Sequence, residues 1–494
     1  MDVTQLEPKE CFRWFAEIAK IPRGSGHEKA ISDYLVAFAE ERKLPVTRDA
    51  HDNVLITKSA SGGMEDAPVV IVQGHMDMVW AKEDGYDFDF AREPVRLLVK
   101  GDAVTADRTT LGADNGIALA FILALLDADT VAHPALEAVL TTGEETGMTG
   151  ASNFNIAALN GRYFINIDSE EEGVFCSSCA GGRRAQLLLP EETVKVSDLP
   201  GSDGFSWFTI RVSGLAGGHS GIEIHKERGN SNRLLGRTLS VLETQFGIYL
   251  ADIKGGSATN VIPSESSAII ATSAGEKALA EVLDTLQAVF AHELKAADGA
   301  GLRLAVTVAP AIGTVMSRDV LRKVLAIATL MPDGVVAMDL SMRNQRLVEA
   351  SNNFAMITRD EKCIVFSSTI RSSVSSKKEF IYDQIAALAD LTGAEAGSSG
   401  DYPAWEYSAE SKLRNVFRQA YASLFGEQAK IKGIHAGLEC ALFAEKFKKI
   451  HRDVDFIAFG PTITGAHSPQ ESLSRVSVEK TWKLLKEALA SLRA

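Results

Sequence analysis

Residues 67–77 read Ala-Pro-Val-Val-Ile-Val-Gln-Gly-His-Met-Asp, a short apolar run that ends in glycine, histidine and aspartate. The run predicts a buried strand at 67–74. Residues 116–126 are typical of an apolar helix, and residues 136–142 and 163–168 of two further buried strands. Strands that alternate with helices in this way predict a doubly wound, mainly parallel α/β sheet with helices on both faces.

Each of these three strands ends in residues that can carry chemistry. His75 and Asp77 follow the first strand, Glu144 and Glu145 follow the second, and Asp168 ends the third. Ligands of open α/β sheets bind beyond the carboxyl ends of the strands. We therefore expect these side chains to converge on one site.

A different pattern begins near residue 184. Alternating, half-exposed strands are predicted at 205–212, 268–272, 302–308 and 363–370, with helices at 232–246 and 277–297. This pattern is typical of an antiparallel sheet with helices on one face.

A turn-rich stretch at 397–403 comes next, and the first pattern then returns, with helices at 412–425, 438–446 and 478–492 and a strand at 454–459. The sequence thus predicts a discontinuous catalytic domain at 1–185 and 398–494, interrupted by an inserted α+β domain at 186–397. Two domains also suit a chain of 494 residues.

Composition excludes several classes of protein. The chain has 65 acidic and 51 basic residues, a net charge of -14, which disfavours binding to nucleic acid or to anionic membranes. The first twenty residues contain four acids and do not resemble a signal peptide. Five cysteines, an odd number, argue against a disulfide framework and favour a reducing compartment, so we expect the protein in the cytoplasm.

The polar residues at the strand ends are of the types that hold zinc when thiolates are absent. Asp114 stands between glycines just before the apolar helix, and His467 lies in a loop rich in glycine and proline. Two of these motifs have a simpler interpretation when taken alone. His75-Met-Asp77 is more often part of a surface loop, and Asp114 could cap the helix. Of the adjacent acids Glu144 and Glu145, one could bind metal while the other acts as general base.

Five motifs together resemble those of the co-catalytic di-zinc peptidases that include carboxypeptidase G2 and aminoacylase. They are His75-Met-Asp-Met78, Gly112-Ala-Asp-Asn-Gly116, Thr142-Gly-Glu-Glu-Thr-Gly147, Ile165-Asn-Ile-Asp168 and Gly465-Ala-His-Ser468. Three further stretches resemble the aminoacyl-histidine dipeptidase branch, and the resemblance runs over nearly the whole chain. They are Gly217-Gly-His-Ser-Gly221, Ile434-His-Ala-Gly-Leu-Glu-Cys440 and Gly460-Pro-Thr-Ile-Thr-Gly465.

The resemblance implies two Zn²⁺ ions per subunit, for which Mn²⁺ or Co²⁺ can substitute. Asp114 would bridge them, with His75 and Asp168 on one ion and Glu145 and His467 on the other. Asp77 would orient His75. Glu144 would be the general base that takes a proton from zinc-bound water and then protonates the leaving amine.

The inserted domain is expected to complete the site. By resemblance, His219 would polarise the scissile carbonyl or hold the oxyanion, and Asn260 and Arg371 would bind substrate, although Arg371 could equally form a surface ion pair. Glu439 is a candidate for the substrate's amino group, with His435 beside it; alternatively both support the metal loop. A homodimer through the inserted domain is also expected, and His219 would act in its own subunit or across the dimer.

The predicted activity is hydrolysis of short peptides, chiefly dipeptides with a free N-terminus and including β-alanyl-histidine. Two alternatives stay open at this point. One is an amidase or aminoacylase that acts on N-acylated amino acids, and the other is a metal-binding homologue that has lost catalysis.

Overall fold

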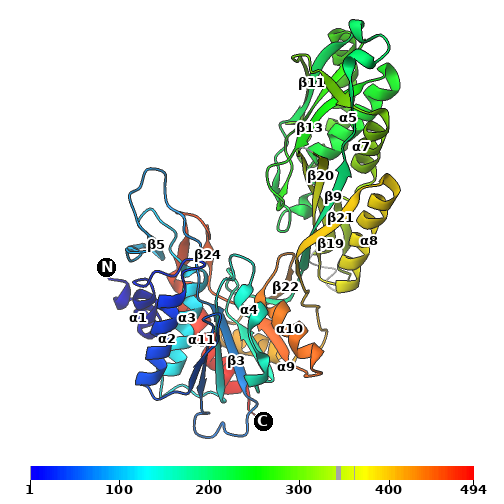
Figure 1. The fold of residues 1–494 in the computed structure, drawn as a ribbon. Coiled ribbons are helices and arrows are strands. Elements are labelled where there is room, and N and C mark those ends of the chain that lie inside the picture. Colours follow the sequence, from blue (N-terminus) through cyan, green and yellow to red (C-terminus); the bar gives the residue numbers. More distant parts are fainter. Residues whose placement is uncertain (1, 341–346, 361, 494) are drawn as a thin grey trace. The chain divides into compact units, whose positions relative to one another are not determined.

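The computed structural model describes residues 2–340, 347–360 and 362–493. The chain forms two compact units (Figure 1). Unit 1 contains Met1–Cys179, Trp405–Gly433 and Leu438–Ala494, and unit 2 contains Ala180–Ala404 and Ile434–Gly437.

Unit 1 is built on an eight-stranded sheet of order β1-β2-β6-β3-β7-β23-β8-β22. The four central strands are parallel, and β2 and β8 join them in antiparallel fashion. The strand bounds are β1 Val46–Arg48, β2 Val54–Lys58, β3 Val70–His75, β6 Leu136–Thr141, β7 Tyr163–Asn166, β8 Val174–Cys179, β22 Lys430–Ile434 and β23 Asp455–Ala458. The predicted α/β class is thus confirmed, with parallel strands at the centre of the sheet.

Helices cover both faces of this sheet, and in Figure 1 α3 and α11 lie on one side of β3 while α4 and α10 lie on the other. Successive side chains of a strand point to opposite faces of the sheet. On one face, Val70 and Val72 of β3 join the larger core. On the other face, Phe164 of β7 packs against Phe443 of α10. The larger core takes α1 Lys9–Ile18, α2 Lys29–Glu41, α3 Ala113–Asp127, α9 Lys412–Phe425 and α11 Arg475–Ser491. The opposite face carries α4 Thr149–Asn153 and α10 Glu439–Lys449.

Two local features of unit 1 position later residues. Every residue of α3 from Asn115 to Leu126 is buried, as expected for a helix that is apolar on all sides. A small sheet of order β24-β25-β5-β4 places residues 465–471 as the connection between its first two strands. Its strands are β4 Leu97–Lys100, β5 Ala103–Ala106, β24 Ile463–Thr464 and β25 Ser472–Ser474.

Unit 2 is built on a nine-stranded antiparallel sheet of order β16-β11-β15-β13-β19-β20-β9-β21, with β18 paired to β19. Its strands are β9 Gly181–Pro190, β11 Ser206–Ser213, β13 Tyr249–Gly255, β15 Ser266–Thr272, β16 Arg303–Val308, β18 Gly334–Met338, β19 Val348–Arg359, β20 Cys363–Ser372 and β21 Glu395–Tyr402. Two short pairs accompany it, β10 Thr193–Lys195 with β17 Thr314–Met316 and β12 Gly218–His219 with β14 Val261–Ile262.

Helices of unit 2 supply one shared core with this sheet, and α5, α7 and α8 lie along the same side of it in Figure 1. The helices are α5 Ser231–Phe246, α6 Glu276–Glu293, α7 Arg318–Leu330 and α8 Ser375–Thr392. The antiparallel sheet with helices on one face agrees with the sequence pattern.

The turn predicted at 397–403 is wrong. Residues 395–402 form the edge strand β21, which pairs with β9 from Glu395↔Leu188 to Ser399↔Arg184. An edge strand needs backbone hydrogen bonds on one side only, and most of β21 is exposed. Its glycines and serines therefore lack the apolar alternation that identifies a half-buried strand.

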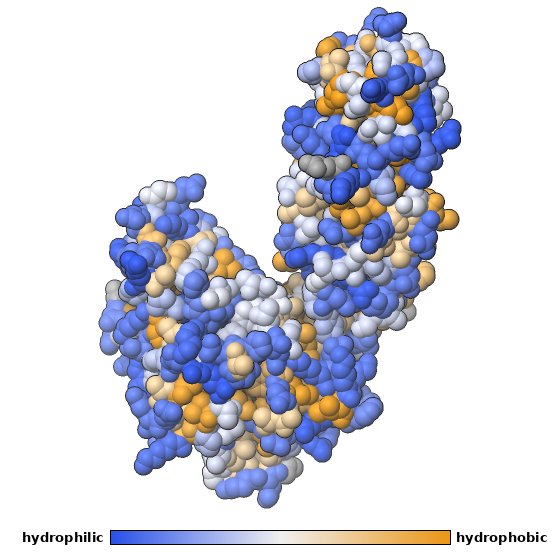
Figure 2. Space-filling model, in the orientation of Figure 1, coloured by the Kyte–Doolittle hydropathy of each residue, from blue (hydrophilic) through white to orange (hydrophobic). Residues whose placement is uncertain are grey.

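The face shown in Figure 2 is mainly polar, with hydrophobic residues in separate patches. Among the residues that the structure describes, no helix is both long enough and apolar enough to cross a membrane. All five cysteines are in the described part of the chain and are free thiols.

Candidate metal centre

His75, the last residue of β3, stands between three carboxylates. Its Nε2 atom lies 3.1 Å from Asp114 Oδ1 and 3.5 Å from Asp168 Oδ1. Its Nδ1 atom lies 3.3 Å from Asp77 Oδ1 on the other side of the ring. One ring nitrogen thus faces the centre, and Asp77 is placed to orient the other.

Asp114 lies between two imidazoles. Its second oxygen, Oδ2, is 3.1 Å from His467 Nε2, and His467 Nε2 is in turn 3.0 Å from Glu145 Oε2. No backbone N–H of α3 in the described residues donates to the Asp114 side chain, whose oxygens face the two histidines, so Asp114 does not cap the helix. The two oxygens of one carboxylate therefore point at histidines that are more than 350 residues apart in the chain.

Three overlapping groups of donor atoms each lie within 4.8 Å. The groups are His75–Asp114–Asp168, His75–Glu144–Glu145 and Asp114–Glu145–His467. The adjacent acids hold their places because the backbone N–H groups of Glu144 and Glu145 both donate to the Asp77 carboxylate, at 3.1 and 3.2 Å. The structure thus brings together all five predicted ligands and the predicted base.

The charges of this cluster fit bound cations. Burial raises the pKa of Glu144 well above its ordinary value, the charge of His75 lowers it, and Asp168 raises it further. Burial likewise raises the pKa of Asp168 to about 6. The Asp114 and Glu145 carboxylates accept hydrogen bonds from the His467 imidazole and raise its pKa to about 11.

A divalent cation would relieve the repulsion among these carboxylates. Imidazole nitrogens and carboxylate oxygens are a donor set that zinc accepts, and the buried Oε1 atom of Glu145 has no hydrogen-bond partner in the described residues. The residues present therefore fit two metal ions.

Asn115 supports the centre, a role that the sequence pattern does not predict. Its Oδ1 accepts the backbone N–H of His75 at 3.2 Å, and its Nδ2 donates to Ile167 O and Asp168 Oδ1, both at 2.7 Å. A single buried amide thus ties the ends of β3 and β7 to the start of α3. The available signal was an asparagine directly before an apolar helix, which by itself suggests only a helix start.

Glu439 also lies in unit 1, where it is fully buried at the start of α10. Its Oε2 accepts hydrogen bonds from Thr141 Oγ1 and Gln73 Nε2, while Oε1 has no partner among the described residues. Burial raises the pKa of this carboxyl to about 7, the charge of His75 lowers it, and Asp168 raises it. Its contacts are with side chains of the sheet.

The other predicted substrate residues gather in unit 2. A Cβ atom at Gly221 would lie 2.8 Å from the His435 carbonyl, 3.0 Å from His219 Cε1 and 3.2 Å from Arg371 Nε, so these three surround the glycine. Asn260, which is exposed, accepts the backbone N–H of Ser220 at 2.9 Å through its carbonyl. The structure therefore brings together His219, Asn260, Arg371 and His435.

The imidazoles of this cluster are neutral near pH 7. Burial lowers the pKa of His435 to about 3, with help from the positive charge of Arg371. Burial and Arg371 also lower the pKa of His219. Arg371 donates to the Tyr402 hydroxyl at 3.0 Å, and His435 Nε2 lies 2.7 Å from Ser351 Oγ. Arg371 is thus left as the positive charge of the cluster.

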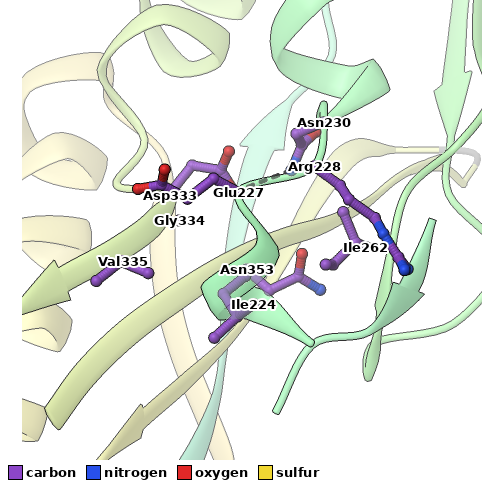
Figure 3. A pocket seen from close by; sticks show the side chains of 9 residues that line it. All are labelled: Ile224, Glu227, Arg228, Asn230, Ile262, Asp333, Gly334, Val335 and Asn353. Atoms are coloured by element: carbon purple, nitrogen blue, oxygen red, sulfur yellow. Dashed lines mark hydrogen bonds between the residues drawn. The ribbon is translucent and has the colours of Figure 1, made fainter. Parts of the chain in front are cut away.

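The segment after His219 borders a cavity of about 240 Å³ in unit 2, shown in Figure 3. Arg228 lines the cavity, donates to Gly217 O and pairs with Glu223, whose other oxygen accepts the backbone N–H of His219 at 3.0 Å. None of the predicted site residues lines it.

Comparisons with known proteins agree with this geometry. A family model described as a peptidase dimerisation domain matches residues 210–298. The cytosol non-specific dipeptidase of Escherichia coli is 37% identical over 100% of this chain and 99% of the relative.

Solved structures show a similar likeness to this chain. The aminoacylhistidine dipeptidase of Vibrio alginolyticus is 34% identical, with a TM-score of 0.90 over 99% of this chain and 98% of that one. A tripeptidase of Staphylococcus aureus, at 15% identity and a TM-score of 0.55 over 99% of both chains, shares the fold. The predicted resemblance is confirmed: this chain belongs to the M20 metallopeptidase family, in the branch of the cytosol non-specific and aminoacylhistidine dipeptidases.

Proposed function

We propose that this protein hydrolyses dipeptides that have a free N-terminus, including Xaa-His dipeptides such as β-alanyl-histidine. The names of the two full-length relatives support this substrate class. The observation that carries the proposal is the Asp114 carboxylate, whose two oxygens each lie 3.1 Å from a different histidine nitrogen. This arrangement suits a carboxylate that would bridge two metal ions.

The two metals are proposed to be Zn²⁺, with Mn²⁺ or Co²⁺ as possible substitutes because these ligands accept all three. His75 and Asp168 would hold one ion with Asp114, and Glu145 and His467 would hold the other. When bound, such ions polarise a carbonyl oxygen and lower the pKa of water toward ~7. Elemental analysis of the purified protein would identify the metals.

Glu144 is proposed as the general base and then the general acid. Its carboxylate lies close to His75 and Glu145, but the two groups of donor atoms that contain Asp114 do not include it. Glu144 is therefore free to exchange a proton while the other residues hold the metals. In this role its carboxylate accepts a proton from the attacking water and returns it to the leaving amine. Asp77 keeps the imidazole of His75 in the tautomer whose Nε2 faces the centre.

The unit 2 cluster is proposed to bind substrate. Arg371 presents a planar fork that can bind both oxygens of a peptide's terminal carboxylate. His219 and Asn260 would donate to the carbonyl oxygen as negative charge develops on it, a contribution worth about 2.7–4 kcal/mol per donor. His435 would support Arg371, and Glu439 is the proposed contact for the amino group.

The test compares wild type with Glu144→Gln, which keeps the shape of the side chain but cannot take a proton. Substrates are carnosine, several unblocked dipeptides and an N-acetylated dipeptide. We expect the wild type to cleave only the unblocked substrates. The variant should bind two metals per chain and be slower by about 10²–10⁴-fold. Preference for the acetylated substrate would make the protein an acylase, and an inactive wild type with two bound metals would refute the proposal.

We also propose that the protein is a cytoplasmic homodimer joined through unit 2, which would serve as the lid and dimerisation domain. The family match at 210–298 and the name of the Escherichia coli relative support this. Edge strand β16 offers a surface for pairing, since Val308 at its end is 71% exposed. Light scattering after size exclusion should give twice the chain mass for wild type and a lower mass for Val308→Arg.

A further inference from the structure

Glu471 is a buried acid that binds no predicted ligand side chain. It is only 2% exposed and lies four residues after His467 in the connection between β24 and β25. Its Oε2 accepts the backbone N–H groups of Leu111 and Gly112 at 2.8 and 2.9 Å, and its Oε1 accepts that of Asp114 at 3.1 Å. One carboxylate therefore fastens the segment of His467 to the segment of Asp114.

Arg23 makes the complementary connection and is also only 2% exposed. Its Nη1 donates to Met76 O and Asp77 O, each at 2.9 Å, and its Nη2 donates to Gly112 O. The guanidinium thus joins the segment that follows His75 to the segment that precedes Asp114. Because a guanidinium carries five donors in a fixed plane, it can hold several carbonyls at once.

Two glycines make room for this guanidinium. A Cβ atom at Gly112 would lie 2.6 Å from Arg23 Nη2, and one at Gly116 would lie 2.5 Å from it. Both glycines belong to the motif around Asp114. The close approach of Arg23 therefore explains why both positions are glycine. At Gly112 the left-handed φ of 71° is a second reason.

Arg23 and Glu471 both form hydrogen bonds with the main chain of residues 111–114, Arg23 with a carbonyl and Glu471 with N–H groups. Glu471 accepts from N–H groups at 111, 112 and 114, whereas Arg23 donates to the carbonyl of 112. Hydrogen bonds to charged groups are about twice as strong as neutral ones. The segment is fixed by contacts that involve no metal.

We propose that Arg23 and Glu471 are positioning residues that hold the three ligand-bearing segments in register before metal binds, and so set the metal affinity. The inference rests on the proposed di-metal centre. It assigns no chemical step to either residue, because both act through the backbone that carries His75, Asp114 and His467.

The first test is Glu471→Gln, whose amide turns an NH₂ group toward at least one backbone N–H. The matched control is Glu137→Gln. Glu137 is also a buried acid that binds main-chain groups, since it accepts the backbone N–H groups of Asn160 and Gly161 at 2.8–3.0 Å. It lies at the start of β6, at the end of that strand away from the metal centre. Zn²⁺ affinity is measured by competition with a chromophoric chelator, and the visible spectrum of the Co²⁺ form reports ligand geometry.

We expect Glu471→Gln to weaken metal binding by about 10–100-fold, as outer partners of metal ligands do, and to change the Co²⁺ spectrum. Glu137→Gln should lower the unfolding temperature but leave both readouts at wild-type values. Equal metal affinity in the two variants would overturn the inference. A wild type that binds fewer than two metals would instead overturn the proposed function.

A second variant covers the case in which Glu471→Gln does not fold. Gly116→Ala would displace Arg23 through a single methyl group. Its control is Gly236→Ala, where the new Cβ would meet Ala328 Cβ at 2.5 Å inside unit 2. Weaker Zn²⁺ binding in the first variant alone supports the role of Arg23, and unchanged binding in both refutes it.

Discussion

Replacing Asp77 with asparagine tests how far the metal centre depends on a carboxylate that is not expected to bind metal. Asp77 accepts hydrogen bonds from Ser25 Oγ at 2.8 Å and from the backbone N–H groups of Glu144 and Glu145, and its Oδ1 lies 3.3 Å from His75 Nδ1. Each of its oxygens accepts one backbone N–H. The NH₂ group of asparagine must therefore face one of them, whichever way the amide turns.

The expected losses of stability and of metal affinity follow from these contacts. Leaving one buried backbone N–H unpaired should lower the free energy of unfolding by about 1–3 kcal/mol. Loss of the negative charge beside His75 should also weaken metal binding by about 10–100-fold. Denaturant unfolding of the metal-free protein measures the first effect, and a Zn²⁺ competition titration measures the second.

Asp298→Asn is the matched control. Asp298 Oδ1 and Oδ2 accept the backbone N–H groups of Gly229 and Ala216, both at 3.0 Å, in unit 2. Asp298 is only partly buried, so we expect a smaller loss of stability than in Asp77→Asn, with no loss of metal affinity. If Asp77→Asn binds Zn²⁺ within twofold of the wild type, the reasoning about His75 is refuted.

Three further predictions concern other parts of the chain. Gly74→Ala should weaken Zn²⁺ binding, because its Cβ would lie 2.6 Å from Asn115 Oδ1; an unchanged chelator titration would contradict this. Phe121→Ala removes a fully buried ring stacked 5.9 Å from Trp482, and should lower the denaturant-derived free energy of unfolding by about 3–5 kcal/mol. Burial raises the pKa of Asp333 from 3.8 to about 6, so the folded protein retains a proton that the unfolded chain releases. The stability of unit 2 should therefore fall as pH rises from about 4 to about 6, and thermal unfolding of Asp333→Asn should lack this fall.

The core of the site could be predicted because it follows strand ends. His75 closes β3, Asp168 comes two residues after β7, and the Glu144–Glu145 pair follows β6, so an apolar run with a polar end located each of them. The spacing alone could not pair Asp114 with His467. That pairing depends on the connection between β24 and β25, which reaches the site through a four-stranded sheet too short to read from periodicity.

Residues that act on the backbone were missed for a common reason. Asn115, Arg23 and Glu471 bind main-chain groups of other segments, and main-chain groups leave no trace in a residue pattern. The edge strand β21 was missed in the same way, since its pairing with β9 uses backbone atoms alone. Side-chain patterns predict which residues gather, whereas the contacts that align them require the fold.

The order of strands in unit 1 has a consequence for synthesis of the chain. β23 lies in the sheet between β7 and β8, although almost three hundred residues separate it from either in sequence. A nascent chain that has emerged through residue 179 therefore has β7 without its neighbour β23. An unpaired strand edge is a template for pairing with other chains. During synthesis this edge of β7 lacks its partner strand until residues 455–458 have been made.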